Sequence, residues 1–362
     1  MKKYFKYLIL FLIFICSIIF MNHNEELYNK SILKVTDIII NETNAQTNGN
    51  LKEEYYNETI KGIIINGKYK NKSTSFDNIR SYSGVYDEKY EVKDEVFVDL
   101  DEDGKVVEVI NLRRDKYLVP LFVLMVCLLI TIGGFKGLTT FLSFCLNLAT
   151  IILITILRDQ HLNIFYLFIP GTIIMCSLSL FLTSGKNKKT LIAIISSILS
   201  LIITFTLSFI IIKIFSSDIP YWYMDYVDIL YDYKEVFLVS ILISGLGAIM
   251  DIAISITSTL NELITNNPKI SIRSLRKSGL NLSNDILGTM VNVLLFTSIS
   301  GGISMLLFVM RNSISVFNAF NMYSKIEMIR FMTGCIGILV TIPVTMYTSI
   351  YFFKTRRKNK WF

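Results

Sequence analysis

The sequence predicts an all-α polytopic membrane protein with about eight transmembrane helices and a small extracytoplasmic β-rich domain between helices 1 and 2. The first observation is composition: 52% of the 362 residues are hydrophobic and only 18% are charged, whereas soluble domains average about 25% charged residues. The second is that the apolar residues gather in long stretches, and roughly 20 apolar residues in a helix cross the hydrocarbon core of a bilayer. The third is that residues 22–116 interrupt this pattern, because they hold 14 basic and 19 acidic side chains.

Residues 1–21 are expected to form an N-terminal signal-anchor helix. Three lysines precede an uninterrupted apolar run. No small-residue cleavage site follows, and Ile15 precedes Cys16 where lipid attachment requires a small residue. We therefore expect an uncleaved anchor, with a removed signal peptide as the alternative.

Residues 22–116 are expected to form the extracytoplasmic domain, with a flexible start and a compact β-rich part at 58–112. Alternating, β-branched runs predict strands at 62–66, 95–99 and 105–110. The acidic stretch 101–104 ends in glycine and predicts a hairpin between the last two strands. Residues 41–57 are rich in asparagine and threonine and predict a loop or linker.

The remainder of the chain is expected to form a seven-helix membrane domain, 117–353, followed by a basic cytoplasmic tail, 354–362. Apolar stretches predict helices at 117–133, 138–157, 162–183, 190–213, 235–264, 285–309 and 326–352. The segment between the fourth and fifth of these helices, 216–234, carries many tyrosines and aspartates. It predicts an interfacial helix, or alternatively an acidic vestibule that attracts cations.

The distribution of basic residues predicts a cell-membrane protein with both termini in the cytoplasm. This orientation places sixteen basic residues on the cytoplasmic side and six at outer loops and outer helix ends. The net charge of +7 reflects this bias, so we expect the lipid bilayer and no nucleic acid as a partner. All five cysteines lie in apolar segments, which predicts neither disulfides nor a metal site, and we expect no cofactor.

The acidic residues of the membrane domain point to a candidate site. Ten of them follow position 116, and seven fall on the outer side or at outer helix ends. The other three are Asp251, Glu262 and Asp285. Asp251 falls near the middle of the helix predicted at 235–264, and a carboxylate at bilayer mid-depth costs roughly 2.5–3.5 kcal/mol on insertion scales.

Polar residues extend this signal along one face of each of two successive helices. The residues of the first stripe are Asp251, Ser255, Ser258 and Glu262, and those of the second are Asn281, Asp285, Gly288 and Asn292. Together they predict an ion or substrate pathway on helices 6 and 7. Small residues suit close helix packing, which we expect at Gly245, Gly247 and Gly288.

Each pathway residue also has a structural alternative. Asp251 is alternatively protonated or hydrogen-bonded within the bundle, and Glu262 is alternatively solvated near the cytoplasmic helix end. Asp285 is alternatively a capping residue at a helix start, where free N–H groups stabilise a carboxylate. Asn292 is alternatively an interhelical hydrogen-bond partner. Arg330 forms either a local ion pair with its neighbour at position 327 or a contact with the pathway acids.

Three stretches of the membrane domain, 245–264, 278–295 and 334–346, resemble the YibE/F-like family of bacterial multi-pass membrane proteins. The order of an anchor, a small extracytoplasmic domain and a Gly-Phe-Lys-Gly turn at 134–137 also fits. The similarity covers about residues 60–353 and implies the fold described above. It implies no activity, because none is assigned to the family. Asn284 and Val293 depart from the family pattern, which has an arginine and a threonine there.

Three functions are consistent with these observations. The first is a transporter or channel-like protein in which Asp251 binds a small ion or a proton. The second is a membrane scaffold or accessory subunit that binds a protein partner through its extracytoplasmic domain. An intramembrane enzyme is the third, and we do not expect it, because the two histidines lie far from any carboxylate motif and no phosphate loop or nucleophile elbow is present. The oligomeric state is left open.

Overall fold

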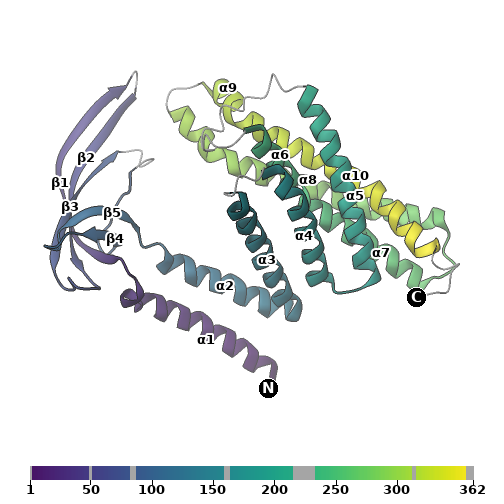
Figure 1. Cartoon of the computed structure of the whole chain (residues 1–362), viewed down its shortest axis with the longest axis horizontal. Coiled ribbons are helices and arrows are strands. Elements are labelled where there is room, and N and C mark those ends of the chain that lie inside the picture. The colour runs from purple at the N-terminus through teal and green to yellow at the C-terminus, as the bar shows by residue number, and fades with distance from the viewer. Residues whose placement is uncertain are drawn as a thin grey trace. The chain divides into compact units, whose positions relative to one another are not determined.

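The computed structural model describes residues 2–48, 51–81, 87–158, 164–214, 233–311 and 315–355. The chain divides into two compact units, Met1–Leu138 and Thr139–Phe362 (Figure 1). The predicted segment 216–234 lies almost entirely outside the described residues.

The elements follow one another in the order anchor helix, strands and membrane helices. The strands are β1 (Ser31–Asn48), β2 (Leu51–Ile64), β3 (Ser73–Ser81), β4 (Glu95–Leu100) and β5 (Val106–Leu112). The helices that flank the strands are α1 (Lys2–Asn22), η1 (Glu25–Leu27) and α2 (Asp115–Gly133). The helices of the second unit begin with α3 (Phe135–Arg158), α4 (Ile164–Ser184), α5 (Lys188–Ile214), α6 (Tyr233–Ser244) and α7 (Leu246–Asn266). They end with α8 (Ile272–Arg311), α9 (Val316–Ala319), η4 (Phe320–Ser324) and α10 (Lys325–Thr355).

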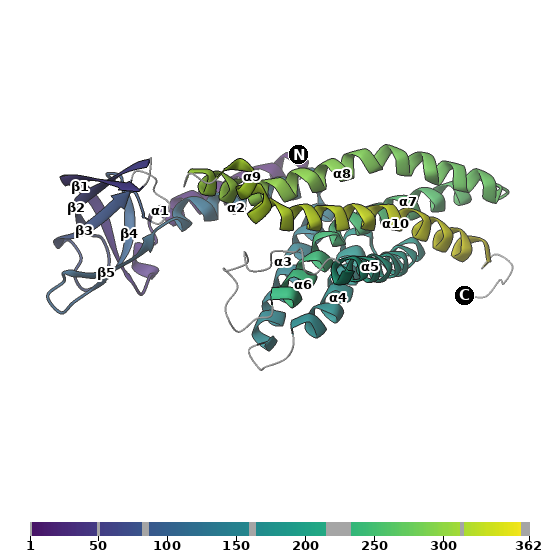
Figure 2. The ribbon, with the colours of Figure 1, turned by 90° about the horizontal axis from the view of Figure 1, so that it is seen from above.

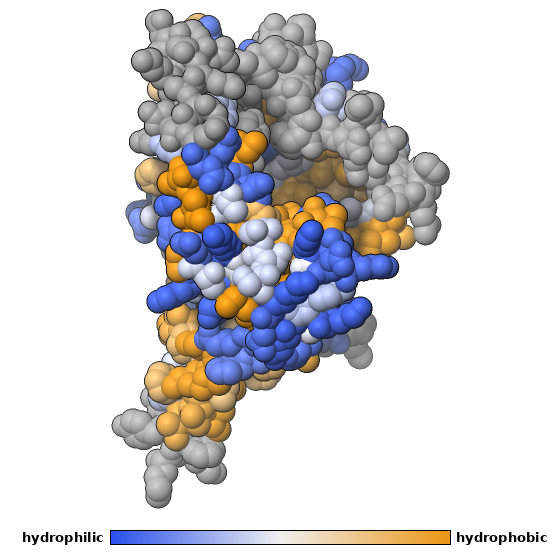
Figure 3. All heavy atoms as spheres, turned by 90° about the vertical axis from the view of Figure 1, so that its left-hand side faces the viewer, coloured by the Kyte–Doolittle hydropathy of each residue, from blue (hydrophilic) through white to orange (hydrophobic). Residues whose placement is uncertain are grey.

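The strands of the first unit form one antiparallel sheet in the order β3-β2-β1-β4-β5. β3 also contacts β5, so the sheet curls toward a barrel with the strand neighbours of an OB-fold. Alternating residues of the strands fill its core, and the face seen in Figure 3 carries hydrophilic residues interspersed with hydrophobic ones. Among the fully buried residues of the strands are Leu33, Val35, Ile60, Val96 and Val98. The predicted hairpin is present, because β4 pairs with β5 and Gly104 turns the chain with φ +69°.

The prediction of a loop at 41–57 is wrong. Asn48 pairs with Leu51, and β1 and β2 form a long hairpin through most of that stretch. Asparagine and threonine disfavour strands only weakly, and the cross-strand ladder of two paired strands outweighs that preference. Composition alone therefore did not indicate this hairpin.

The second unit and the end of the first contain the membrane-spanning helices, and the predicted fold class is confirmed. Seven helices of the described chain are long and apolar enough to cross a membrane, and the apolar part of α1, Tyr7–Asn22, is shorter. α5, α7 and α10 pack against one another at the centre of the second unit. α8 lies along the outer edge beside α7 and α10 (Figure 2).

Two helix boundaries differ from the sequence prediction. α8 begins at Ile272 and not at position 285, so Asp285 lies well inside a helix and the capping alternative for Asp285 is wrong. Residues 272–284 are polar, and the sequence prediction placed the start of the helix at the first residue of its apolar stretch. The helix extends beyond that stretch, and these polar residues form its first turns. The helix predicted at 235–264 is interrupted at Gly245, where α6 ends and α7 begins.

Candidate functional site

The predicted stripe on α7 lies on the side of the helix that faces away from the apolar core. Asp251 and Glu262 are exposed, and Ser255 and Ser258 are half-buried. The residues of the opposite side are buried, and they are Ile252, Ala253, Ile256, Thr257 and Leu260. The four stripe residues share one face because each residue of a helix turns by about 100°. α7 therefore presents two carboxylates and two hydroxyls on one side.

The second stripe lies on the outward side of α8. Asn281, Asp285, Gly288 and Asn292 are all exposed, and no residue from 284 to 303 is buried. The side of α8 that meets the bundle is formed by buried Leu275 and by partly buried apolar residues packed against α7 and α10. The amides and the carboxylate of α8 are therefore left on its free side.

α7 and α8 contact each other through apolar side chains. Among the residues that the structure describes, no hydrogen bond or ion pair joins one polar stripe to the other, and none is made by the Asp251 carboxylate. The structure thus brings the two helices together and leaves both stripes on exposed sides. The hydrogen bond within the bundle that was the alternative for Asp251 is not made in these described ranges.

The three glycines expected at helix contacts have different surroundings. At Gly245 an added Cβ would lie 3.8 Å from the Cα of Gly334 on α10, so two helix backbones approach closely there. At Gly247 and at Gly288 an added Cβ would meet no atom within 4 Å. The packing expected at these two glycines is not made by any described part of this chain.

Arg330 forms the local ion pair and does not contact the pathway acids. Its guanidinium donates to Glu327 Oε1 at 2.6 Å and to Ser240 Oγ at 3.2 Å. The ion pair lies within α10, and the hydrogen bond to Ser240 links the start of α10 to α6.

A second polar cluster, which the sequence analysis did not identify, joins α1, the sheet and α2. The side chain of Arg113 is fully buried. Its guanidinium donates to Glu95 Oε2 at 2.5 Å, to the Met21 carbonyl at 2.8 Å and to Asn24 Oδ1. It also lies 5.1 Å from the centre of the Tyr28 ring. Nothing in the sequence pattern marks Arg113 as buried, because arginine at the end of a strand is normally solvated.

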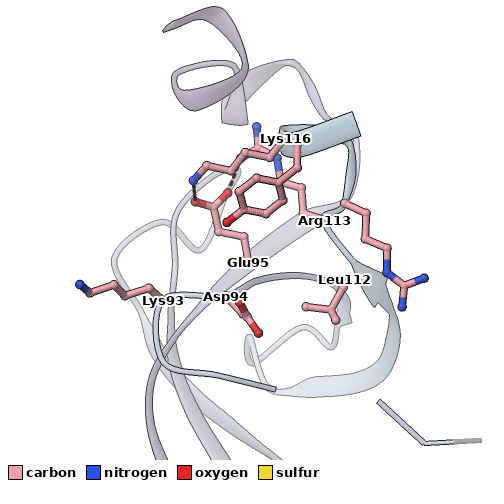
Figure 4. Close-up of a pocket in the computed structure, with 8 residues that line it drawn as sticks. Lys93, Asp94, Glu95, Leu112, Arg113 and Lys116 are labelled. Atoms are coloured by element: carbon pink, nitrogen blue, oxygen red, sulfur yellow. Dashed lines mark hydrogen bonds and ion pairs between the residues drawn. The ribbon is translucent and has the colours of Figure 1, made fainter. Parts of the chain in front are cut away.

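The Glu95 carboxylate is shared between two cations. Lys116 Nζ donates to its other oxygen at 2.7 Å, so the carboxylate lies between Arg113 and Lys116 (Figure 4). A hollow of about 110 Å³ lies beside these residues. Its other lining residues are Lys93, Asp94, Leu112, Arg114 and Tyr117. Figure 4 shows the charged end of Lys93 pointing away from Glu95. Arg113 also lies 3.9 Å from the carboxylates of Glu25 and Asp115. Each cation of the cluster therefore faces a carboxylate, which suits a structural joint better than a binding site.

Two tyrosines of the first unit have perturbed pKa values. Burial, together with a hydrogen bond to the Asp115 carboxylate, raises the pKa of Tyr28. Burial also raises the pKa of Tyr90, with a smaller effect of Glu88. Both phenols therefore stay neutral above the pH at which an ordinary tyrosine ionises.

The centre of the second unit contains a seam of buried hydroxyls that the sequence analysis also missed. Its members on α5 and α10 are Ser196, Ser200, Thr204, Ser208, Thr341, Thr345 and Ser349. The four-residue spacing on both helices was the available signal. Thr204 lines a hollow of about 10 Å³, roughly the size of one water, and its hydroxyl has no hydrogen-bond partner in the described chain. Small side chains allow two helices to pack closely, and this close packing of α5 and α10 accounts for the seam.

No group of three or more histidine, cysteine, aspartate or glutamate side chains within the described ranges could hold a metal ion.

Two family models match the chain. Residues 121–355 match the model described as YibE/F-like protein, and residues 26–112 match the one described as YibE/F family N-terminal domain. No curated protein matches the chain. No solved structure matches it.

Proposed function

The chain belongs to the YibE/F family, and from this premise we propose that it is a transporter or channel-like membrane protein that binds a proton or a small cation at Asp251. The observation that carries the proposal is the Asp251 carboxylate, which lies near the middle of the candidate span Tyr233–Asn266 and has no hydrogen-bond or ion-pair partner among the described residues. Exposure of such a group to acyl chains costs roughly 2.5–3.5 kcal/mol. A proton, a cation or water at this position removes that cost, which is why intramembrane carboxylates are typical of ion pathways.

The residues of the two stripes have distinct roles in this proposal. Asp251 binds the ion, and the hydroxyls of Ser255 and Ser258 replace part of its hydration shell. Glu262 lies eleven residues further along the same face of α7, about 16 Å away at 1.5 Å per residue. With the termini in the cytoplasm, Glu262 is at the cytoplasmic opening of the route. Asp285 and Asn292 lie on the free side of α8, so they form a separate polar face and are not ligands of the ion at Asp251.

α6 and α7 meet at Gly245, six residues before Asp251. The backbone of Gly245 stays helical (φ −86°, ψ −13°), so the two helices form one candidate span, Tyr233–Asn266, with Asp251 near its middle. Gly245 also lies close to Gly334, so movement there would shift α7 relative to α10.

Reconstitution of the purified full chain tests the proposal. Proton, sodium and potassium fluxes are measured in vesicles, and thermal shifts are recorded with each ion. Asp251→Asn keeps the size of the side chain and removes its charge. We expect it to lower the flux and the apparent ion affinity by roughly tenfold or more, since tenfold corresponds to about 1.4 kcal/mol.

Asp99→Asn is the matched control. Asp99 pairs with Lys30 on the surface of the first unit, at 2.7 Å, so the same chemical change should leave flux and thermal shift unchanged. A folded Asp251→Asn protein with the flux of the wild type would refute the proposal.

A further inference from the structure

We infer that the start of α8 binds the headgroups of anionic phospholipids. The site is a basic face that consists of Lys269, in the turn before α8, and of Arg273, Arg276 and Lys277 on its first turns. All four side chains are exposed. The inference does not depend on ion binding at Asp251, because it uses only the position of that residue in its span.

The cations of the basic face have no anionic partner within the described part of the chain. No ion pair joins any of the four to a carboxylate there. The nearest acidic residues along the sequence are Glu262 on α7 and Asp285 on α8, and both are exposed and form no ion pair in the same ranges. Four like charges within nine residues repel one another, and a bound anion offsets that repulsion.

The packing of Gly279 indicates the depth of the basic face. A Cβ added at Gly279 would lie 2.9 Å from Met346 Sδ on α10 and 3.8 Å from Leu260 Cδ2 on α7, so these residues lie at about the same level. Leu260 follows Asp251 by nine residues, which is about 14 Å along α7. Arg276 precedes Gly279 by three residues, which adds about 4 Å along the antiparallel α8.

The basic face therefore lies about 18 Å from the middle of the span, where the hydrocarbon core has a half-thickness of about 15 Å. This distance places the cations among the lipid headgroups. It also separates them from the polar residues further along α8, which lie closer to the middle of the bilayer.

The neighbours of the basic face are typical of a membrane interface. The guanidinium of Arg276 lies 5.0 Å from the centre of the Tyr347 ring. Tyr347 is exposed, and so is Tyr351 one turn further along α10. Tyrosines are enriched at the headgroup level, where the ring meets apolar groups and the hydroxyl meets polar ones.

The apolar residues of this turn distinguish a lipid from a soluble anion. Leu280 is exposed, and it lies one turn from Arg276 and Lys277 on the same side of α8, toward the apolar stretch. A phospholipid can place its phosphate oxygens against the cations, where a guanidinium donates two parallel hydrogen bonds, and its acyl chain against Leu280. Inorganic phosphate can make only the first of these contacts.

Lipid selectivity of the full chain in vesicles tests the inference. The protein is reconstituted in phosphatidylcholine with spin-labelled phosphatidylglycerol or spin-labelled phosphatidylcholine, and the motionally restricted fraction of each label gives their relative association constants. We expect the wild type to prefer phosphatidylglycerol. The variant with Arg273→Gln, Arg276→Gln and Lys277→Gln should lower this preference by roughly tenfold or more, because three cations at the headgroup level are removed.

A variant with the same loss of charge elsewhere is the matched control. Lys61, Lys68 and Lys105 are exposed on the sheet of the first unit, and their replacement by glutamine should leave the preference unchanged. Inorganic phosphate, compared with chloride at equal ionic strength, should also leave it unchanged. Thermal unfolding checks that both variants fold.

Three results would overturn the inference. The first is a wild type that binds both labelled lipids equally, and the second is a basic-face variant that keeps the preference or loses no more of it than the control. The third is loss of the preference in inorganic phosphate, which would assign the face to a soluble anion. The outcome is separate from that of the flux experiment, because lipid selectivity is measured without an ion gradient and with Asp251 intact.

Discussion

Replacement of the buried Arg113 by methionine tests whether the joint between α1, the sheet and α2 stabilises the first unit. Arg113→Met keeps a long side chain but removes three hydrogen bonds, to Glu95, Met21 and Asn24. Removal of one partner from a buried ion pair typically costs about 3–5 kcal/mol. Lys116 still pairs with Glu95 at 2.7 Å, so we expect a loss near the lower end, about 3 kcal/mol.

Hydrogen exchange followed by mass spectrometry on the solubilised full chain measures this loss locally. A loss of about 3 kcal/mol corresponds to exchange roughly a hundredfold faster in peptides that cover β4 and β5, since each 1.4 kcal/mol is about tenfold. The tryptophans, Trp222 and Trp361, both lie outside the first unit, so their fluorescence would not report this opening.

Arg114→Met is the control for the buried position. Arg114 is 59% exposed and pairs with Glu88, and an exposed pair contributes about 1 kcal/mol or less. Exchange in β4 should then change by less than roughly fivefold. If Arg113→Met also stays within that range, the cluster does not hold the unit together and the reasoning is wrong.

Two further predictions concern the tyrosines and the α2–α3 turn. The pKa values of Tyr28 and Tyr90 are raised in the folded state. Their contribution to stability is therefore complete below the ordinary tyrosine pKa of about 10. It is lost as the pH rises from there through the pKa values of the folded state. Tyr90→Phe should therefore reduce the loss of stability of the first unit at alkaline pH. Hydrogen exchange between about pH 9 and 12, with each rate corrected for intrinsic exchange, measures this loss. An unchanged pH profile would count against the burial argument. Gly137→Ala should destabilise the turn by about 1–3 kcal/mol, because its Cβ would lie 1.9 Å from the Leu129 carbonyl oxygen, whereas Gly133→Ala, with open space, should not. Thermal unfolding compares the two, and equal midpoints would contradict the close approach.

The class of the protein could be predicted from sequence because it depends on local quantities. A run such as 190–213 is long and apolar enough to span a bilayer whatever surrounds it, and α5 (Lys188–Ile214) matches that prediction closely. The hairpin at 95–110 was predictable for a similar reason, since the turn at Gly104 and the alternation of its strands are encoded within a few residues. Family membership likewise follows from stretches of contiguous sequence.

The start of α8 and the long β1–β2 hairpin were not predictable in this way. Residues 272–284 are too polar to signal a membrane helix, yet they continue α8 because Leu275 and Gly279 pack into the bundle. Asparagine-rich residues 41–48 are part of a strand because a partner strand lies beside them. Each case depends on a contact with another segment of the chain, which the local pattern of residues does not reveal.

By itself the sequence determined the membrane class, the spacing of both polar stripes and the placement of a carboxylate in the middle of a spanning helix, because periodicity decides which residues share a face. Only the tertiary structure decided which way those faces point. Ile252, Ile256 and Leu260 bury their side of α7 against the bundle, and this leaves Asp251 on the free side. Likewise, only the packing of α1, the sheet and α2 decided that Arg113 is buried, since burial depends on which segments meet and not on the residue itself.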